Sequence, residues 1–418
     1  IFLTGIVAFA FASLLCALAP SAGVLIAARG LQGIGGALLT PGSLAILEAS
    51  FTAADRAKAI GAWSGLGGVA TAIGPFLGGY LIDAVSWRLI FLINLPLAAL
   101  VIVVALRHVP ESSNPNAART IDRAGVALVA LGLAGLTYSL IEGPASGWRS
   151  PRDAVVGVLG ILALIAFIVT ESRRRAPMLP LAIFRSAAFS ATNAVTFVIY
   201  GALGGALFLV PVQLQQVAGY SPLQAGVALL PITAIMLTLS SRSAGLAARI
   251  GPCTQMSLGP LLVAAGMLLL SRVGASSGYV SAVLPAVVVL ALGLATTVAP
   301  LTATALSSAP AEHSGLASAV NNTVARSAGL LAVAVLPAAA GISGRSYLDP
   351  AAFSTGFSTA VIIAAITCAL GGLLAALTIR DDPLRRTARA TDSGYHCALD
   401  APPQACQDEA VTAQPERH

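Results

Sequence analysis

The chain consists of long apolar stretches separated by short polar connections. Because a helix rises about 1.5 Å per residue, roughly 20 apolar residues cross a hydrocarbon core about 30 Å thick. Twelve stretches of this kind are bounded by charges or by turn-forming residues, and they run near 1–18, 22–48, 58–82, 89–106, 124–141, 153–170, 187–212, 222–241, 254–272, 280–305, 315–341 and 357–379. The pattern predicts an all-α integral membrane protein with twelve transmembrane helices.

The composition supports a membrane protein over a soluble enzyme or a nucleic-acid-binding protein. Of 418 residues, 57% are hydrophobic and 10% are charged, whereas a soluble domain has about 25% charged residues. The net charge of +6 does not indicate DNA binding, because the basic residues lie between apolar runs. The five cysteines lack zinc-site spacing, and the chain has no nucleotide-binding loop or catalytic triad pattern. We therefore expect no enzyme activity, no metal site, no cofactor and no nucleic-acid partner.

The basic residues also predict the orientation of the chain. If the first helix runs outward, sixteen of the 23 basic residues lie in the inward connections and in the tail. Basic residues concentrate on the cytoplasmic side of plasma-membrane proteins. We therefore expect a multi-pass protein of the cell membrane, with a cytoplasmic C-terminal tail.

A weak internal repeat predicts the domain organisation. Residues 41–56 and 300–313 each combine a proline-containing helix of small residues with a short inward loop bearing an acid and a basic residue or His. Transporters often build two halves from such repeats, and here the offset is eight helices. This predicts two helices before Ile1 and the following division: an incomplete N-terminal bundle 1–108, an inserted two-helix linker 109–185, a C-terminal six-helix bundle 186–380 and a disordered tail 381–418. A plain arrangement of six plus six helices remains the alternative.

One arginine is predicted to lie inside the second apolar segment. An arginine at the centre of a membrane helix costs about 2.5–3.5 kcal/mol on insertion scales, so Arg29 should face a water-filled cavity or a partner. Gln32 lies three residues further on, on the same helical face. Alternatively, Arg29 snorkels toward the outer interface.

The third segment contains a pattern of small residues and a proline. Gly61, Gly74, Gly78 and Gly79 allow a neighbouring helix to approach closely, and Pro75 removes a backbone hydrogen bond and bends the helix. Because glycine and proline are common in membrane helices, ordinary packing is the competing interpretation.

The later half carries a second set of polar residues in apolar surroundings. We predict that Asn321, Asn322 and Arg326, with Thr323, form a patch facing the central cavity or the opposing half. A structural hydrogen bond to a neighbouring backbone is the alternative. Further candidates for cavity lining are Asn94, Asn193, Tyr200 and Gln213.

Together these motifs resemble the drug:proton antiporters of the major facilitator superfamily, in the fourteen-helix branch. The resemblance covers residues 1 to about 380 and rests on Arg29 followed by Gly61-x8-Ala70-x3-Gly74-Pro75-x2-Gly78-Gly79, on Trp87-Arg88-x-x-Phe91-x-x-Asn94-x-Pro96, on Gln215-x-x-x-Gly219-Tyr220-Ser221-Pro222 and on Gly315-x-Ala317-Ser318-Ala319-x-Asn321-Asn322. Ala70 stands where the antiporter motif has glycine.

The resemblance implies a two-bundle carrier of which helices three to fourteen are present. It implies that Arg29 serves proton coupling or conformational switching, and that Gly74 and Pro75 bias the carrier toward export. Gly245, Arg249 and Gly251 resemble the second copy of the family's cytoplasmic gate motif. The family's acid in the first helix has no counterpart here, and all 17 acidic residues lie in loops, in the tail or at segment ends.

We therefore expect a monomeric secondary transporter that exports small amphipathic organic compounds, such as drugs or antibiotics, in exchange for protons. Binding is expected between the two halves near the bilayer midplane, by alternating access. Two alternatives remain: a facilitator or importer of a neutral solute, and a truncated remnant that does not transport.

Overall fold

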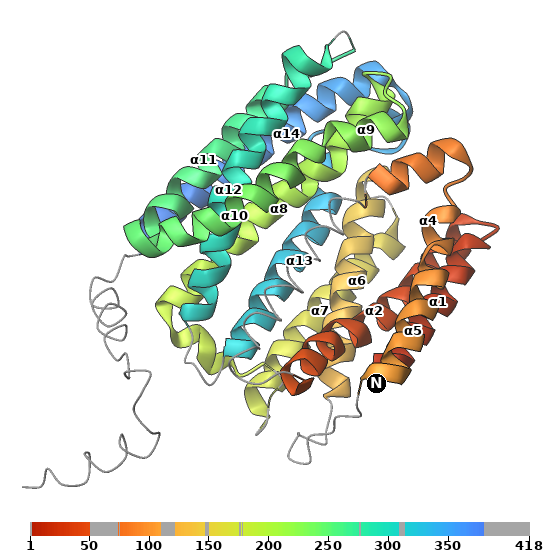
Figure 1. Ribbon diagram of the computed structural model, residues 1–418, viewed down its shortest axis with the longest axis vertical. Coiled ribbons are helices and arrows are strands. Elements are labelled where there is room, and N and C mark those ends of the chain that lie inside the picture. Colours follow the sequence, from red (N-terminus) through yellow and green to blue (C-terminus); the bar gives the residue numbers. More distant parts are fainter. Residues whose placement is uncertain are drawn as a thin grey trace, which may run out of the picture. The chain divides into compact units, whose positions relative to one another are not determined.

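The computed structural model describes residues 2–50, 74, 76–109, 122–146, 150–174, 177, 179–275, 277–308 and 314–379. All regular structure in these residues is helical (Figure 1). The helices are α1 (Phe2–Ala17), α2 (Ala22–Ser50), α4 (Leu89–Leu92), α5 (Asn94–His108), α6 (Arg123–Ala145), α7 (Pro151–Arg173), η1 (Leu181–Arg185), α8 (Ala187–Gln216), α9 (Pro222–Ala228), α10 (Leu230–Ile250), α11 (Pro252–Leu270), η2 (Tyr279–Val283), α12 (Leu284–Ser307), α13 (Ser314–Ala339), η4 (Gly344–Leu348) and α14 (Pro350–Thr378).

The prediction of an all-α membrane protein is confirmed. Within the described residues, 10 helices are long and apolar enough to cross a membrane, and α1 is a shorter apolar helix of 16 residues. The expected segment 58–82 lies mostly outside the described residues, although residues 76–84 are helical. The predicted tail 381–418 lies wholly outside them.

Some helix ends differ from the predicted boundaries for identifiable local reasons. Helix α14 begins at Pro350, seven residues before the predicted 357, because Asp349 caps it by accepting hydrogen bonds from the amides of Ala351 and Ala352. Proline at the first helical position has no amide that needs a partner. The single predicted segment 222–241 is divided at Leu229 into α9 and α10, and Pro231 lies in the first turn of α10.

Small residues set the spacing of the first helices. Helix α1 packs on α2, α4 and α5. A Cβ on Gly35 would lie 2.6 Å from the backbone nitrogen of Phe9, so α1 and α2 touch through their backbones. Helices α6 and α7 pair in the same way, since a Cβ on Gly160 would lie 2.6 Å from the nitrogen of Leu136. Close backbone approach of this kind maximises van der Waals contact inside lipid.

The later helices share a continuous apolar core. Helix α8 packs on α13 and α14, and α11 packs on α12 and α14. The largest fully buried side chains include Ile199, Leu209, Met267, Leu290, Phe353 and Phe357.

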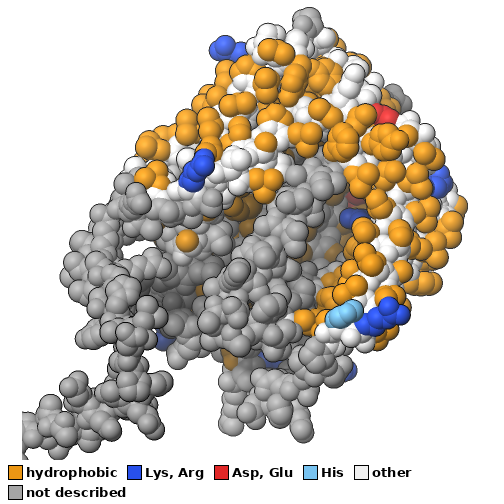
Figure 2. All heavy atoms as spheres, viewed as in Figure 1, with side chains coloured by type: hydrophobic (Ala, Val, Ile, Leu, Met, Phe, Trp, Pro, Cys, Tyr) orange, Lys and Arg blue, Asp and Glu red, His pale blue; other side chains and the backbone are white. Residues whose placement is uncertain are grey.

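The outer surface of the described helices, early and late, is apolar. Figure 2 shows hydrophobic side chains over much of the described surface in that view, with few charged groups among them. Exposed residues include Leu106 at 68%, Leu131 at 67% and Leu377 at 71% of their full accessible area. Such surface is suited to lipid contact, so the chain is a multi-pass membrane protein.

Candidate transport site

The first helices hold a hydrogen-bonded polar network that includes Arg29. A guanidinium nitrogen of Arg29 donates to Gln32 Oε1 at 2.5 Å, and Gln32 Nε2 donates to Ser13 Oγ at 2.6 Å. Asn94 Nδ2 reaches the same Ser13 oxygen at 3.4 Å, and the Ser13 hydroxyl donates to the carbonyl of Phe9 at 2.8 Å. Ser13 therefore joins side chains of α1, α2 and α5 at one point.

The hydrogen bond of Arg29 is directed along α2 and away from the nearer end of that helix. Its acceptor is Gln32, which lies further from the Ala22 end. The guanidinium also lies 5.9 Å from the ring centroid of Phe91, within cation–π range. Arg29 itself is exposed, whereas Gln32 is 3% exposed. The network therefore holds the charge of Arg29 at its accessible end, and the buried side-chain amide of Gln32 has hydrogen-bond partners on both sides.

Three of the predicted residues meet in this network, and one member was missed. The sequence predicted Arg29 and Gln32 as a pair and Asn94 separately. Ser13 was not predicted, because a single serine in an apolar helix usually bonds its own backbone. No pattern in the sequence distinguishes Ser13 from other serines of that kind.

A second polar cluster joins α8 to α13. Asn321 Nδ2 donates to Thr196 Oγ1 at 2.9 Å and to Asn193 Oδ1 at 3.3 Å, and all three side chains are buried. Asn193 Nδ2 and the Thr196 hydroxyl donate in turn to backbone carbonyls one turn earlier in α8. The cluster is a closed interhelical contact.

The predicted patch on α13 is divided between two faces of the helix, which corrects the expectation of one continuous patch. Asn321 faces α8, whereas Asn322, Thr323 and Arg326 are exposed. Asn322 and Thr323 donate to carbonyls of their own helix. Consecutive residues are about 100° apart around a helix, so Asn321 and Asn322 cannot face the same partner. Asn322 and Arg326, four residues apart, share the exposed face.

Residues 76–84 contact the start of α9 at two points. The carboxylate of Asp83 accepts hydrogen bonds from the Ser221 hydroxyl at 2.8 Å and from the Leu223 amide at 2.9 Å. A Cβ on Gly79 would lie 2.7 Å from the Pro222 carbonyl oxygen and 2.8 Å from the Leu223 Cα. Asp83 and Gly79 thus join an early helix to a helix about 140 residues later. We call this contact the Asp83 clasp.

The remaining residues of the predicted glycine pattern differ in their surroundings. Gly79 makes the close approach that the pattern predicts, while Gly74 and Gly78 have no described atom within 4 Å of an added Cβ. Gly61 and Pro75 lie outside the described residues. The sequence did not identify Asp83, since it was counted with the acids at segment ends.

In the predicted cytoplasmic gate, only Gly251 can be described fully. It joins α10 to α11 with φ +93°, a backbone conformation that favours glycine. Gly245 and Arg249 lie within α10, but their side chains lie outside the described residues.

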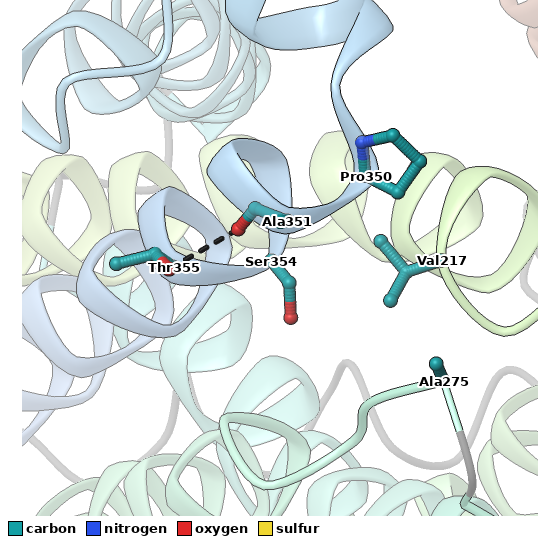
Figure 3. Close-up of a pocket in the computed structure, with 6 residues that line it drawn as sticks. All are labelled: Val217, Ala275, Pro350, Ala351, Ser354 and Thr355. Atoms are coloured by element: carbon teal, nitrogen blue, oxygen red, sulfur yellow. Dashed lines mark hydrogen bonds between the residues drawn. The ribbon is translucent and has the colours of Figure 1, made fainter.

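A pocket of about 440 Å³ lies beside the start of α14 (Figure 3). Its lining residues are Val217, Ala275, Pro350, Ala351, Ser354 and Thr355. Gln213 is buried behind the lining residue Ser354. Its Nε2 donates to Val273 O at 2.7 Å and to Ser354 Oγ at 3.3 Å. Tyr200 is half-buried against the core of the later helices. In the described structure, neither Gln213 nor Tyr200 lines this pocket. No three His, Cys, Asp or Glu side chains gather there as metal ligands.

Comparison with known proteins identifies the family of this helical arrangement. Residues 1–334 match the sequence profile of the Major Facilitator Superfamily. The chain belongs to this superfamily.

Several relatives with established names are about one third identical to the chain over the aligned residues. It is 35% identical to the tetracenomycin C resistance and export protein of Streptomyces glaucescens, over 80% of this chain and 62% of that protein. It is 35% identical to the multidrug resistance protein Stp of Mycobacterium tuberculosis, over 76% of this chain and 59% of that protein. The puromycin resistance protein of Streptomyces alboniger is 32% identical over 97% of this chain and 82% of its own length. The chain thus spans about 60% of the first two relatives.

Solved transporter structures share the fold at low sequence identity. An autoinhibited peptide transporter of the POT family superposes with a TM-score of 0.63 at 14% identity, over 91% of this chain and 83% of that one. A bacterial homologue of the human lysosomal transporter Spinster, in an inward-facing conformation, superposes with a TM-score of 0.55 at 17% identity, over 90% and 82%. These likenesses support the major facilitator-type fold.

Proposed function

We propose that the protein is a secondary active transporter that exports small amphipathic organic compounds, such as drugs or antibiotics, in exchange for protons. The observation that carries this proposal is the similarity to three proteins named for antibiotic or multidrug resistance, one of which aligns with 97% of the chain. The sequence contains no nucleotide-binding loop, which favours a gradient as the energy source.

The Asp83 clasp supports transport by alternating access. Carriers of this kind move two groups of helices against each other around a central site. The clasp joins residues 76–84 to α9 through two hydrogen bonds and one glycine contact, at the ends that the charge distribution predicts to be outer. A small contact of this type can break and re-form during a transport cycle.

The polar network of α1, α2 and α5 is our proposed coupling site. Arg29 contributes a fixed positive charge, and Gln32, Ser13 and Asn94 hold it in place. On α13, Asn322 and Arg326 are the residues we propose to meet substrate, because they are exposed. Asn193 and Asn321 hold α8 and α13 together, and Tyr200 and Gln213 support the surrounding core.

The finer topology belongs to the same proposal. We infer a fourteen-helix arrangement in which α6 and α7 form the inserted pair between the bundles 1–108 and 186–380, with a cytoplasmic C-terminal tail. The tight pairing of α6 with α7 supports this division. Gly245, Arg249 and Gly251 would form the cytoplasmic gate, and Gly61, Gly74, Pro75, Gly78 and Gly79 the hinge that biases the carrier toward export. We infer a monomer in the plasma membrane.

The direct test is efflux from bacteria that lack their own drug pumps. Cells expressing the protein should lose a preloaded amphipathic fluorescent dye faster than control cells, and a protonophore should abolish the difference. Arg29→Ala should remove this efflux, whereas Arg152→Ala should retain it. Arg152 makes a good control because it only stacks on Tyr138 at 5.8 Å, within the α6–α7 pair.

Each outcome of this test separates the proposal from a named alternative. Dye movement that continues with a protonophore, and runs down the dye gradient in either direction, would indicate a facilitator. A protein that reaches the membrane but moves none of a panel of amphipathic dyes and antibiotics would refute export of that compound class.

A further inference from the structure

Two buried acidic side chains meet at one end of the paired helices α6 and α7. Asp122 precedes α6, and Glu171 lies in the last turn of α7. Asp122 Oδ2 and Glu171 Oε1 lie 2.6 and 2.9 Å from the same point, the position that a Cβ on Gly125 would occupy. The two oxygens therefore share the small space left open by a glycine.

Each carboxyl group has one satisfied oxygen and one unsatisfied oxygen. Asp122 Oδ1 accepts from the Gly125 amide at 2.8 Å and from Arg174 at 2.7 Å, while Glu171 Oε2 accepts from the Leu179 amide at 2.7 Å. Asp122 Oδ2 and Glu171 Oε1 are buried without a hydrogen-bond partner among the described residues. The Asp122 side chain is 6% exposed and Glu171 is 2% exposed. Two ionised oxygens facing each other in this setting would repel and remain unpaired.

The charges around the pair favour a single proton as the bound species. Arg174 pairs with Asp122, and the neighbouring Arg123 and Arg173 are exposed. Among the described residues, one ionised carboxylate therefore balances one arginine, and a neutral second carboxyl completes the cluster. Calcium and magnesium ions take six or more oxygen ligands, whereas two carboxylate oxygens of the described residues face this space.

We propose that Asp122 and Glu171 form a proton-binding site in which one proton lies between Asp122 Oδ2 and Glu171 Oε1. The two carboxyl groups share this proton in a hydrogen bond. When the site is emptied, the proton leaves to water and both groups become carboxylates. The proposal does not depend on what the protein transports or in which direction.

The electrostatic surroundings of Asp122 favour its ionised form. Its pKa lies below the ordinary aspartate value, chiefly because the Gly125 amide donates to it, then because of the adjacent Glu171 side chain and the nearby Arg174 charge. These interactions outweigh the opposing effect of burial.

The site is linked to the later helices through Leu179. The Leu179 amide donates to Glu171 Oε2, and the Leu179 side chain packs against the cluster of Ile183, Phe189, Ala317 and Val320. That cluster lies beside the interhelical hydrogen bonds of α8 and α13, because Phe189 O accepts from Asn193 and Val320 precedes Asn321. The protonated pair thus fixes the end of α7 to the segment that leads into α8.

Infrared spectroscopy of the purified full chain tests the proposal. At neutral pH the wild-type protein should show the carbonyl absorption of a protonated carboxylic acid. Glu171→Gln and Asp122→Asn should both remove this band. Asp153→Asn should keep it, because Asp153 is a buried acid at the opposite end of α7 that already accepts from Ser146 at 2.8 Å.

A second measurement follows the link to Leu179. Raising the pH until the band disappears should lower the protection factor of the Leu179 amide, the slowing of its hydrogen exchange relative to an unstructured peptide at the same pH, by about tenfold, because its acceptor is no longer held by the pair. In Glu171→Gln the side-chain amide donates to Asp122 and the carbonyl accepts from Leu179, so the protection factor of the Leu179 amide should stay the same at every pH. This variant preserves the hydrogen bonds and should fold even if Asp122→Asn does not.

Absence of the band from the wild type, including the case of a water bridging two carboxylates, would overturn the proposal. Retention of the band in Glu171→Gln would also overturn it. Neither result depends on the efflux assay, so the proton site and the transport function fail separately.

Discussion

Gly79→Ala is the substitution that most directly tests the Asp83 clasp. The added methyl group would lie 2.7 Å from the Pro222 carbonyl oxygen, 2.8 Å from the Leu223 Cα and 3.0 Å from the Leu223 nitrogen. All three atoms belong to the backbone, so no flexible side chain can move aside to make room. Residues 76–84 and α9 must instead separate at this point.

The size of the effect follows from the distances. Non-bonded carbon atoms prefer separations of about 3.5–4.0 Å, so relief requires a displacement of roughly 0.5–1 Å. The Asp83 bonds to Ser221 and Leu223, now 2.8 and 2.9 Å, would then lengthen to about 3.3–3.9 Å, where hydrogen bonds are weak or broken. Losing two exposed bonds to a charged group costs about 1.5 kcal/mol in total after allowance for solvent. The joined conformation should therefore lose roughly a factor of ten in population relative to the separated one.

Double electron–electron resonance spectroscopy measures the distance between residues 76–84 and α9 directly. Nitroxide labels can be attached through an unnatural amino acid at the exposed Val85 and Val227, which leaves the buried Cys16 and Cys368 unchanged. Gly79→Ala should shift the distance distribution toward longer values and lower the rate of dye efflux.

The matched control for this experiment is Gly78→Ala. Both variants add one methyl group to adjacent helical positions, so they share any gain in helix propensity. An added Cβ at Gly78 has no described atom within 4 Å, so this variant should leave the contact with α9 intact and give the wild-type distribution of label distances. If Gly79→Ala gave the wild-type distance distribution, the contact would not constrain the two segments, and the reasoning would be refuted.

Three further predictions concern the polar groups. Arg29→Ala should lower efflux at least tenfold at normal protein levels in the membrane, measured by dye loss, because no other charged side chain belongs to the described network. Asn321→Leu should destabilise the protein by about 1 kcal/mol in thermal unfolding, because its two acceptors on α8 lose their donor, whereas Asn322→Leu should have little effect. Equal melting temperatures for these two variants would contradict the division of α13 into two faces. The folded-state pKa of Asp122 is lowered, so its stabilisation is complete above the ordinary value of 3.8 and is lost as pH falls through the lower folded pKa. The difference in melting temperature between the wild type and Asp122→Asn should therefore become smaller at acid pH.

The sequence predicted the helices well because hydropathy reports the membrane environment directly. Apolar stretches of about 20 residues must form helices in lipid, where each backbone amide and carbonyl needs a partner within the segment. The boundaries were less accurate where local chemistry decides them, as at Asp349 and Pro350, whose capping pattern extends α14 beyond its most apolar part. An aspartate followed by proline is a signal that a closer inspection of helix starts can use.

Polar contacts between helices were predicted only in part because the sequence does not specify which helices are neighbours. Arg29 and Gln32 are three residues apart on one helix, so their contact follows from helical spacing. Ser13 and Asp83 bond to residues 19 and 138 positions away, and no local pattern encodes those pairings. Glu171 was placed outside its helix because the predicted segment stopped at 170, although α7 continues to Arg173.

The two polar clusters differ in a way that constrains where coupling and binding can occur. The α8–α13 cluster is closed, since each amide or hydroxyl donor described there has an acceptor and all its side chains are buried. The network around Ser13 is open at Arg29, which is exposed and can exchange Gln32 for another acceptor. A buried closed cluster keeps two helices together during movement, whereas an accessible charge can respond to a substrate or to a titrating group elsewhere. Similar residue types in the two clusters therefore support different roles. Substitutions at Arg29 and Arg326 should change transport more than stability, whereas substitutions at Asn193 and Asn321 should change stability first.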